Sequence, residues 1–348
     1  MKREITYSQS IKEALEQSLA RDKNIIIMGL GVDDPKGVFG TTLNIHKKFK
    51  KNVYDLPTCE NSFTGFGLGL AISKFKPIIV HQRVEFSLLS IEQIFNQIAK
   101  WNYMSGGKVN VPMVIRLIIG RGWGQGPQHS QSLETIFAHM PGLKVVSPSN
   151  AKDAKGMLIS SIKDPDPVIF FEHRWLHSIK DQVPKKYYLT KINKAKIIKK
   201  GADITVISFS YALIESLRAV NFLKKININC ELIDLRCLRP IDKKTIISSV
   251  KKTGKVLIVD NGWTTNGISA EISSVINENI DKKIVVRRIG VYNVPIPSTP
   301  SLAKYCYPDE ISVIEIISKM LKKYVPKKIM PKRRKNLDQP DSNFKGPF

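Results

Sequence analysis

One carboxylate stands alone in a long stretch of small and apolar residues. Glu60 is the only charged residue between Asp55 and Lys74, and it comes just before a run in which every second residue from 65 to 69 is glycine. A carboxyl group among apolar neighbours tends to keep its proton and to share it with one specific hydrogen-bond partner. General acid–base catalysis requires such a group. The alternative is structural, because Glu60 could simply begin a buried glycine-rich helix. This stretch alone leaves both interpretations open.

The glycine patterns do not match the common phosphate-binding loops. No G-x-x-x-x-G-K-[ST] occurs, and the glycines at 65–69 and 120–126 alternate strictly, unlike the G-x-G-x-x-G of nicotinamide-binding folds. Alternating glycines favour close approach of the backbone to a partner or a bulky ligand. The sequence therefore gives little support to a nicotinamide-dependent enzyme.

The composition fits two ordinary globular domains in a reducing compartment. The chain has 348 residues, of which 42% are hydrophobic, and this suits two cores. Its four cysteines lie far apart without a C-x-x-C pair, so we expect neither a disulfide framework nor a zinc site. No secretory signal pattern and no run of 18 apolar residues occurs. We therefore expect a cytoplasmic protein without a membrane span.

The net charge of +25, from 55 Lys and Arg against 30 Asp and Glu, raises the question of nucleic-acid binding. Most of the excess is lysine spread along the whole chain, and clusters occur only at 194–200 and 322–335. Aromatic residues that could stack on bases are not interleaved through these clusters. We therefore expect that nucleic acid is not a main partner.

Short apolar runs alternate with helical patterns in the first half of the chain. Ser8–Ala20 is predicted to be an amphipathic helix with Ser8 as its N-cap, and Ser87–Tyr103 is predicted to be a second helix. The predicted strands are the runs at 25–28, 77–80, 113–119, 145–146 and 168–171. Continuous rather than alternating apolar runs are typical of parallel strands that are covered on both faces. We therefore predict a doubly wound α/β domain.

A second α/β series follows a polar, lysine-rich stretch at 181–200, which we interpret as a linker or an edge segment. The predicted strands of this series are 204–207, 230–235, 256–259 and 284–286, and the predicted helices are 213–225 and 268–278. Prolines and charges dominate after Val325 and predict a tail. The predicted domains are therefore 1–185, a linker at 186–200, a second domain at 201–325 and a basic, flexible tail at 326–348.

An ordered set of motifs in this chain resembles the motifs of a known family. Besides Glu60 in its context, these motifs are Tyr103–Gly107, Gln128–Ser132, Pro141–Pro148, Asp153–Gly156, Gly201–Thr205, Asp234–Pro240 and Val294–Pro297. In this order they resemble the β subunit of the thiamine-diphosphate-dependent 2-oxo acid dehydrogenases (the pyruvate, branched-chain and acetoin types) of the transketolase superfamily. The resemblance covers residues 3 to 325.

The resemblance implies a fold, a partner and an activity. The fold would be a pyrimidine-binding α/β domain followed by a transketolase C-terminal domain. Members work as α₂β₂ heterotetramers in which the α chain supplies the Gly-Asp-Gly motif that holds magnesium and diphosphate, and this chain contains no Gly-Asp-Gly. The activity would be decarboxylation of a 2-oxo acid on thiamine diphosphate, followed by acyl transfer to lipoamide on a dihydrolipoyl acyltransferase.

The resemblance also assigns roles around the cofactor. Glu60 matches the glutamate that hydrogen-bonds the pyrimidine ring nitrogen and so activates the cofactor. Phe86 matches the aromatic residue that packs against the pyrimidine, although ordinary core packing is its alternative. Gln82 corresponds to a glutamine near the cofactor in the branched-chain types. The alternative, which we weigh equally, is that Gln82 is only a polar residue at the end of a strand.

His129 lies in the Gln128–Ser132 motif, and the resemblance places it near the reacting carbon. There it could hold the substrate carboxylate or assist acyl transfer to lipoamide. A lone histidine on a loop is otherwise most often structural. The sequence around His129 favours the functional role.

A potassium site is also implied by the resemblance. In relatives, backbone carbonyls and an aspartate hold the ion, and oxygen ligands suit such a hard cation. The matching residues are Met113, Ser161, Ile162, Asp164 and Asp166. Asp166 replaces an asparagine that is usual in the family, which puts occupancy of the site in doubt.

Two departures concern the substrate. Relatives carry an acidic pair after the first strand, where this chain has glycine at 29 and 31, with Asp33 and Asp34 only later. Arg83 could clamp an extra anionic group of the substrate, or it could pair with Glu85 in a solvated position, which we favour because exposed opposite charges are common. These changes weaken a claim that the substrate is pyruvate.

Two other functions remain as alternatives. The chain could be the C-terminal half of a split transketolase or of a deoxyxylulose-phosphate synthase, but the Tyr103–Gly107 and Gln128–Ser132 motifs favour the dehydrogenase. It could also be a docking subunit that has lost catalysis. The presence of Glu60, Phe86 and His129 argues against that.

Overall fold

The computed structural model describes residues 3–334 and 339–340, and these divide into two compact units. In the described part of the chain, the first unit comprises residues 3–120 and 136–192, and the second comprises 121–135, 193–334 and 339–340. The chain therefore leaves the first unit at residue 121 and returns to it at residue 136. The sequence pattern did not predict this excursion, and the predicted domain boundaries stay predictions.

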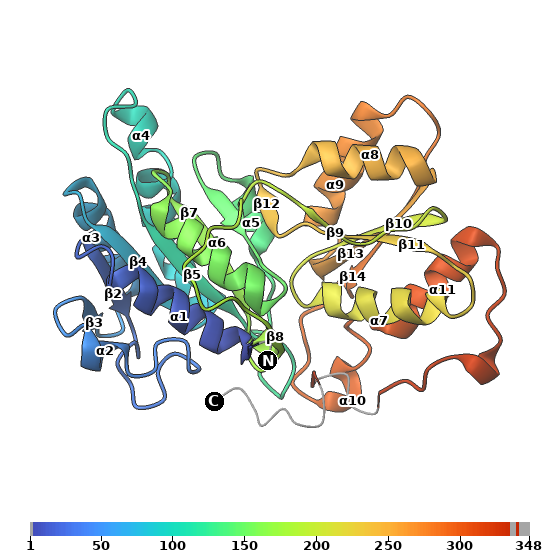
Figure 1. Ribbon diagram of the computed structural model, residues 1–348, viewed down its shortest axis with the longest axis horizontal. Helices are drawn as coiled ribbons and strands as arrows, with labels where there is room; N and C mark the ends of the chain where they lie inside the picture. Colours follow the sequence, from blue (N-terminus) through green and yellow to red (C-terminus); the bar gives the residue numbers. More distant parts are fainter. Residues whose placement is uncertain (1–2, 335–338, 341–348) are drawn as a thin grey trace. The chain divides into compact units, whose positions relative to one another are not determined.

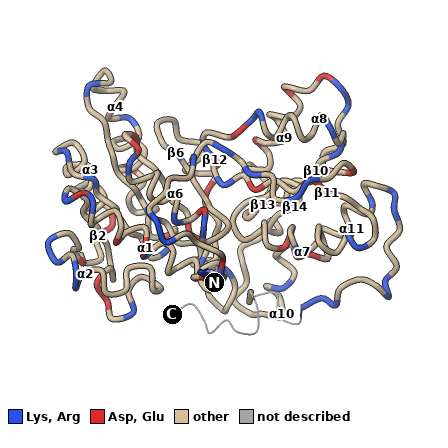
Figure 2. Tube along the Cα trace, in the orientation of Figure 1, with Lys and Arg blue, Asp and Glu red and all other residues tan. Residues whose placement is uncertain are grey.

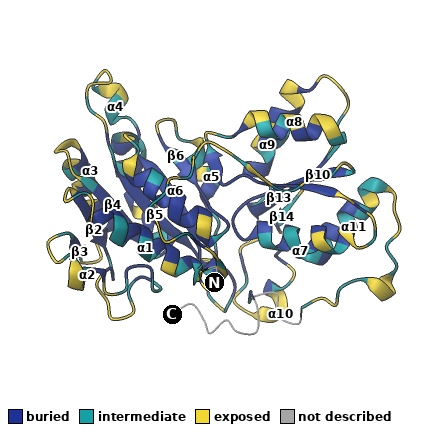
Figure 3. Cartoon of the chain, in the orientation of Figure 1, coloured by how far each residue is buried: buried dark blue, intermediate teal, exposed yellow. Residues whose placement is uncertain are grey.

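The first unit contains a parallel sheet in the strand order β6-β7-β5-β4-β2-β3 (Figure 1). Its strands are β2 (Ile25–Gly29), β3 (Val53–Asp55), β4 (Lys76–His81), β5 (Val114–Ile119), β6 (Lys144–Val146) and β7 (Val168–His173). Every apolar run that the sequence predicts as a strand in this half forms one. Their residues are almost all buried, as parallel strands covered on both faces must be (Figure 3).

Helices lie on both faces of this sheet. The helices before residue 193 are α1 (Tyr7–Leu19), α2 (Ile45–Lys48), α3 (Glu60–Ile72), η1 (Val84–Ser90), η2 (Gln93–Ile98), α4 (Trp101–Met104), α5 (Glu134–His139), α6 (Ala151–Lys163) and η3 (Arg174–Leu176). The connections through α3 and α6 run in opposite directions across the sheet. Because such connections are right-handed, α3 and α6 belong to opposite faces. Helix α1 packs against α6, and β1 (Glu4–Thr6) pairs antiparallel with β8 (Lys180–Gln182).

The N-cap of α1 is Thr6, so the predicted cap at Ser8 is wrong. The Thr6 Oγ1 accepts a hydrogen bond from the Gln9 backbone N–H at 3.2 Å, and the Gln9 side chain accepts one from the Thr6 N–H at 2.9 Å. This reciprocal pair is a capping box, which needs Ser or Thr three residues before Glu or Gln. Only Thr6 has that spacing to Gln9, and the helix begins one residue earlier than predicted.

The predicted helix at 87–103 is helical but not continuous. It consists of the 3₁₀ helix η1, the π-helix η2 and the short helix α4. In η1 the Ser87 hydroxyl donates to the Val84 carbonyl at 2.6 Å, three residues back, which suits the tighter 3₁₀ turn. Apolar spacing predicted helix here but carried no information about the changes in pitch.

The second unit is built on a five-stranded sheet in the order β14-β13-β10-β11-β9. The strands after residue 193 are β9 (Lys196–Lys199), β10 (Ile204–Ser208), β11 (Cys230–Asp234), β12 (Cys237–Arg239), β13 (Lys255–Trp263) and β14 (Val285–Val291). In this sheet β9 runs antiparallel to β11, and the other neighbours are parallel. The lysine-rich stretch thus supplies an edge strand, and the predicted strands of this half all form.

The helices of the second unit are α7 (Ala212–Lys224), α8 (Lys243–Thr253), α9 (Ile268–Asn279), α10 (Pro300–Ala303), α11 (Glu310–Leu321) and η4 (Lys327–Ile329). Helix α7 packs against α11, and α8 contacts α9. The core lies where α7 and α11 meet the strands and includes Val206, Leu223, Leu257 and Ile314.

Part of the predicted tail lies against the second unit. Met330 packs on its core, Arg333 pairs with Asp309 at 3.0 Å, and Arg334 pairs with the buried carboxylate of Glu215. Residues 335–338 and 341–348 of the predicted tail lie outside the described residues. The predicted flexibility of 326–348 stays a prediction.

Candidate active site

Glu60 is the first residue of α3 and is buried, with 6% of its surface exposed. Its helix follows β3 at the carboxyl end of the parallel sheet, where ligands of such sheets bind. Among the described residues, no side chain forms a hydrogen bond or an ion pair with the Glu60 carboxyl. A buried carboxyl without a protein partner suits a hydrogen bond to a ligand.

Glycine at 67 lets α3 lie close to the sheet. A Cβ atom on Gly67 would stand 2.8 Å from the side chain of Ile79 in β4 and 3.3 Å from that of Met113. A Cβ on Gly69 would meet nothing within 4 Å. Gly67 is therefore required for packing within this unit. Gly69 faces open space, where the backbone of another element or chain could approach closely.

A buried hydrogen-bond network ties α3 to β4 and η1. The Thr64 hydroxyl lies 3.2 Å from His81 Nε2 and donates to the Ser90 hydroxyl at 3.1 Å. Since Thr64 has one proton, which goes to Ser90, Nε2 of His81 is the donor to Thr64. Burial lowers the pKa of His81 to about 3, so the imidazole is neutral. This network fixes α3 one turn after Glu60.

Gln82 and Phe86 follow the carboxyl end of β4, which is the same end of the parallel sheet as the start of α3. The Gln82 side-chain amide donates to the Leu30 carbonyl at 3.0 Å. Phe86 is half-buried in η1, and η1 packs against α3. The first unit thus brings Glu60, Gln82 and Phe86 to neighbouring elements at the carboxyl ends of its strands.

The prediction that Arg83 lies in a solvated position is wrong, because only 8% of its surface is exposed. Its guanidinium lies 5.8 Å from the centroid of the Phe39 ring, and that of Arg174 lies 4.8 Å from it. Burial lowers the pKa of Arg83, and the charge of Glu85 counteracts this. Burial and the neighbouring Arg83 lower the pKa of Arg174 to about 10. The predicted electrostatic interaction between Arg83 and Glu85 is therefore present, but Arg83 is buried rather than solvated.

His129 belongs to the 121–135 loop of the second unit and is half-buried. Gly126 before it has a φ of +69°, which favours glycine, and the carbonyl of Gly126 accepts the His129 N–H at 3.5 Å. A pocket of about 530 Å³ lies beside the loop and is lined by residues that include Gln128, Trp263 and Pro295. His129 and Glu60 therefore lie in different units.

A clamp from β13 holds the end of this loop. The side-chain amide of Asn261 donates to the Ser132 hydroxyl and to a carboxyl oxygen of Glu134, both at 3.1 Å. Burial, with a smaller effect from the charge of Asp260, raises the pKa of Glu134 to about 7. Burial also raises the pKa of Asp260, whose carboxylate accepts the backbone N–H of Ser269 at 2.8 Å.

At the predicted potassium site, a lysine ammonium lies between the carboxylates. Lys144 Nζ is 2.6 Å from Asp164 Oδ1 and 2.9 Å from Asp166 Oδ2. The carbonyls of Met113 and Ser161 accept the backbone N–H groups of Val168 and Asp164. The described residues contain no group of three or more His, Cys, Asp or Glu side chains that could hold a metal. The site, which also includes Ile162, stays a prediction.

Sequence reasoning missed the residues that position the site. His81 ends a strand, and Thr64 lies inside a helix whose glycines dominate the pattern. Glu134 follows the Gln128–Ser132 motif but contacts Asn261, 127 positions later. A polar residue that ends an apolar strand run was the one signal that could have indicated His81.

Two family models match the chain, and between them they cover most of it. Residues 3–178 match "Transketolase, pyrimidine binding domain" and residues 193–313 match "Transketolase, C-terminal domain". The pyruvate dehydrogenase E1 component subunit beta of Rickettsia felis is 35% identical over 322 residues, which cover 91% of this chain and 98% of that protein. The chain belongs to the family of 2-oxo acid dehydrogenase E1 β subunits.

Other members of the E1 β family show the same match. The acetoin:2,6-dichlorophenolindophenol oxidoreductase subunit beta of Cupriavidus necator is 34% identical, with 92% of this chain and 99% of that protein covered. The mitochondrial pyruvate dehydrogenase E1 component subunit beta of Drosophila melanogaster is 37% identical, with 92% and 90% covered. These relatives confirm the resemblance that the motifs predicted and favour it over a split transketolase.

A solved structure agrees on the fold. The structure titled "Split gene transketolase, inactive beta4 tetramer" matches 91% of this chain and 99% of its own with a TM-score of 0.78, at 19% sequence identity. The predicted α/β fold of transketolase type is confirmed. The E1 family depends on thiamine diphosphate, and its β subunits work with an α subunit. In the part of the chain that the structure describes, no helix is long and apolar enough to cross a membrane.

Proposed function

We propose that this chain is the β subunit of an enzyme that decarboxylates a 2-oxo acid on thiamine diphosphate and passes the acyl group to the lipoamide of a dihydrolipoyl acyltransferase. The observation that carries the proposal is the carboxyl group of Glu60, a buried residue at the start of α3, which has no side-chain partner among the described residues. Such a group fits the pyrimidine nitrogen of the cofactor. The E1 β relatives support the same activity.

Thiamine diphosphate, when bound, supplies a carbon nucleophile that adds to the keto group of the substrate. Glu60 would hold a proton at its carboxyl oxygen and share it with the pyrimidine ring nitrogen. The buried Thr64–His81–Ser90 network would keep the helix that carries Glu60 from shifting. Phe86 would exclude water and offer an aromatic face, and Gln82 would provide an amide beside it.

His129 would act on the substrate from the second unit. As a half-buried imidazole on a loop held by Asn261, it could donate to the substrate carboxylate or carry a proton during acyl transfer. The pocket of about 530 Å³ beside this loop offers room for a flexible arm. His129 is thus the second residue that we propose as catalytic.

Exposed apolar surface supports an α partner and an α₂β₂ heterotetramer. The exposed fractions are 61% for Phe66 in α3, 66% for Leu89 in η1 and 88% for Tyr103 in α4. An apolar hollow of about 230 Å³, lined by residues that include Leu56 and Phe63, lies beside the start of α3. Exposed apolar groups gathered on neighbouring elements are typical of an interface. The chain has no Gly-Asp-Gly, so we assign the magnesium and diphosphate ligands to that partner.

The finer features remain parts of the proposal. The second domain would dock the acyltransferase, and potassium at Met113, Ser161, Ile162, Asp164 and Asp166 would be structural. The pairing of both carboxylates with Lys144 argues for weak occupancy by that ion. The substrate branch stays open, and so does the predicted cytoplasmic location.

The test is to produce the chain together with an α-type subunit and to measure reduction of an artificial electron acceptor with pyruvate, 2-oxobutyrate or branched 2-oxo acids. We expect activity that requires both thiamine diphosphate and magnesium. A cofactor-bound heterotetramer that is silent on all these acids would contradict the proposal. Activity with a sugar phosphate instead would favour the transketolase alternative.

A further inference from the structure

Two arginines of the first unit converge on one aromatic ring at the carboxyl end of the sheet. Arg83 follows β4, Arg174 directly follows β7, and β5 lies between these two strands. The guanidinium carbon of Arg83 lies 5.8 Å from the centroid of the Phe39 ring, and that of Arg174 lies 4.8 Å from it. Both distances are within the range of a cation–π contact. The carboxyl ends of parallel strands are where such sheets bind ligands.

The loop that carries Phe39 is held in place from below. Phe39 has a φ of +51°, a backbone conformation that costs free energy for any residue other than glycine. The carbonyl of Val38, the buried residue before it, accepts the Thr41 backbone N–H at 2.9 Å and the Thr41 hydroxyl at 2.6 Å. The Thr41 hydroxyl oxygen in turn accepts a hydrogen bond from the buried Arg116 at 2.8 Å. The ring is therefore fixed, and the strain of its backbone suggests that its position serves a function.

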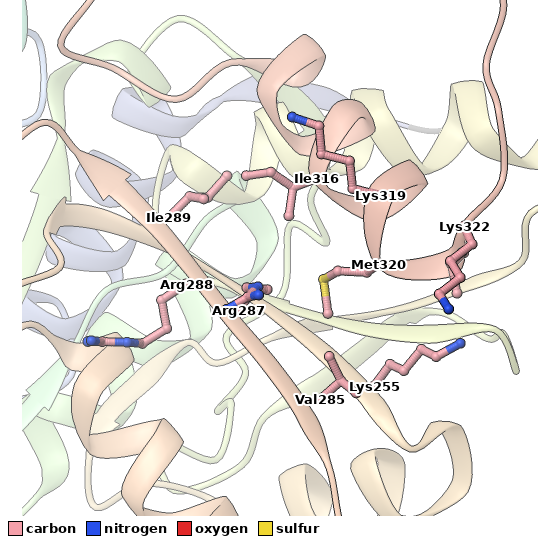
Figure 4. A pocket seen from close by; sticks show the side chains of 10 residues that line it. Lys255, Val285, Arg287, Arg288, Ile289, Ile316, Lys319, Met320 and Lys322 are labelled. Atoms are coloured by element: carbon pink, nitrogen blue, oxygen red, sulfur yellow. The ribbon is translucent and has the colours of Figure 1, made fainter.

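The burial of Arg83 distinguishes this cluster from other positive surface of the protein. Lys and Arg residues are scattered over the whole chain (Figure 2). Arg287 and Lys322, for example, line a pocket of about 680 Å³ in the second unit (Figure 4), but both are exposed, so water and salt screen their charge. Around the buried Arg83 the dielectric constant is lower, and a guanidinium there attracts an anion more strongly.

The two guanidiniums carry more positive charge than Glu85 offsets. Burial lowers the pKa of Arg83, and the charge of Glu85 counteracts this, whereas burial and the repulsion of Arg83 lower the pKa of Arg174 to about 10. In the strand before Arg174, the Glu172 carboxylate is already bound by Arg116. Arg83 and Arg174 both stay protonated at neutral pH. An anion between them would relieve their mutual repulsion.

This arginine cluster adjoins the candidate active site. The Phe86 backbone N–H donates to the Arg83 carbonyl at 3.2 Å, at the start of the 3₁₀ helix η1. Residues three apart lie on the same side of such a helix, so Arg83 shares a side of η1 with the aromatic residue that we assign to the cofactor. η1 packs against α3, which begins at Glu60. A substrate at Glu60 and Phe86 would therefore lie next to Arg83.

We propose that Arg83 and Arg174 bind a second anionic group, a carboxylate or a phosphate, on the side chain of the 2-oxo acid substrate. The planar fork of Arg83 donates two parallel hydrogen bonds to the oxyanion, Arg174 adds the second positive charge, and the Phe39 ring orients both guanidiniums. This inference rests on the proposed function and extends it by naming the class of substrate. It also replaces the solvated ion pair with Glu85 that the sequence favoured for Arg83.

The first measurement is binding to the assembled α₂β₂ complex by isothermal titration calorimetry. Glutarate has a carboxylate at each end and no keto group, so it cannot react, and 5-methylhexanoate has the same shape with an uncharged isopropyl group at one end. We expect glutarate to bind about tenfold more tightly or better, because charge-assisted hydrogen bonds to a buried arginine are worth at least that factor. Arg83→Met should remove this preference, and Arg174→Met should reduce it.

Arg21→Met is the matched control. Arg21 is exposed, also lies over an aromatic ring, at 4.3 Å from the centroid of Tyr187, and precedes β2 at the amino ends of the strands. This variant should change the ratio of the two dissociation constants by less than about twofold, because an exposed charge contributes little.

The second measurement is turnover with an artificial electron acceptor. We expect kcat/KM for 2-oxoglutarate to exceed that for 5-methyl-2-oxohexanoate, its uncharged isostere, by about tenfold or more, and Arg83→Met to lower this ratio by the same factor. Using 2-oxo-3-(phosphonooxy)propanoate in place of 2-oxoglutarate shows whether phosphate or carboxylate is the preferred group. A purely structural role of Arg83 would lower both rates together and leave the ratio unchanged, which would overturn the proposal.

The two measurements separate this inference from the proposed function. If glutarate is preferred and Arg83→Met removes the preference, but no 2-oxo acid is turned over, the anion site is supported and the proposed function is contradicted. If 2-oxo acids are turned over and neither Arg83→Met nor Arg174→Met changes either ratio, the proposed function stands and this inference is overturned. Should Arg83→Met fail to assemble, Arg174→Met, at a half-buried position, decides by the same ratios.

Discussion

Glu134 should make the second unit less stable as the pH rises. Its carboxyl is buried beside Asp260, and its pKa is raised from 4.5 to about 7. The folded protein therefore keeps a proton that the unfolded chain loses. Stability falls as the pH rises from about 4.5 to about 7 and is then level. At about 1.4 kcal/mol for each pH unit, the total loss is about 3 kcal/mol.

The variant Glu134→Gln removes this titration while keeping an oxygen that can accept from Asn261. Burying an amide has a cost of its own, but that cost does not change with pH. The variant should therefore gain about 2 to 3 kcal/mol relative to the parent between pH 5 and pH 8. Glu278→Gln, at the exposed end of α9, serves as a control that should show no such gain.

The free energy of unfolding would be measured by urea titration at both pH values. Replacing Trp101 and Trp175 by phenylalanine leaves Trp123 and Trp263, which both lie in the second unit, as the fluorescent probes. If the difference between Glu134→Gln and its parent is the same at pH 5 and pH 8, Glu134 is ionised in the folded state. The argument from burial would then be refuted.

Two further predictions concern the first unit. Arg116→Met should lower the free energy of unfolding by about 3–5 kcal/mol, because it leaves Glu172 buried without its guanidinium partner. A urea titration measures this loss, and a loss under about 1 kcal/mol would contradict the prediction. His81, whose pKa is lowered to about 3, should make the unit lose stability as the pH falls below 6.5, by about 2 kcal/mol at pH 5. His81→Gln should remove that acid sensitivity in the same titration, and an unchanged pH profile would show that His81 is not the cause.

The strands of this protein could be predicted from sequence because they are continuous buried runs. Residues 25–28 and 204–207, for example, have no polar side chain that could favour another structure except Thr205, and all of them lie in strands. Local hydrogen bonds were harder to predict. The cap at Thr6 depends on the side chain of Gln9, and the 3₁₀ turn at Ser87 depends on a bond to a backbone carbonyl.

Long-range polar contacts could not be predicted from spacing at all. The clamp from Asn261 to Glu134 and the network from Thr64 to His81 join elements whose approach follows from the packing of whole sheets. The burial of Arg83 has the same origin. A charged residue that follows a strand is predicted from sequence to be exposed, but Arg83 is buried by the packing around it. The family motifs predict Glu60 as a site residue, whereas the residues that hold its helix in place could be found only in the structure.

The measurement that tests the central claim most directly is the activity of Glu60→Ala in the assembled heterotetramer. Glu4→Ala, an exposed residue of β1 in the same unit, is the control. We predict that Glu60→Ala lowers thiamine-diphosphate-dependent decarboxylation of a 2-oxo acid by ~10²–10⁴-fold, while assembly and the activity of Glu4→Ala are retained. Full activity in Glu60→Ala would contradict the assignment of this carboxyl as the group that activates the cofactor.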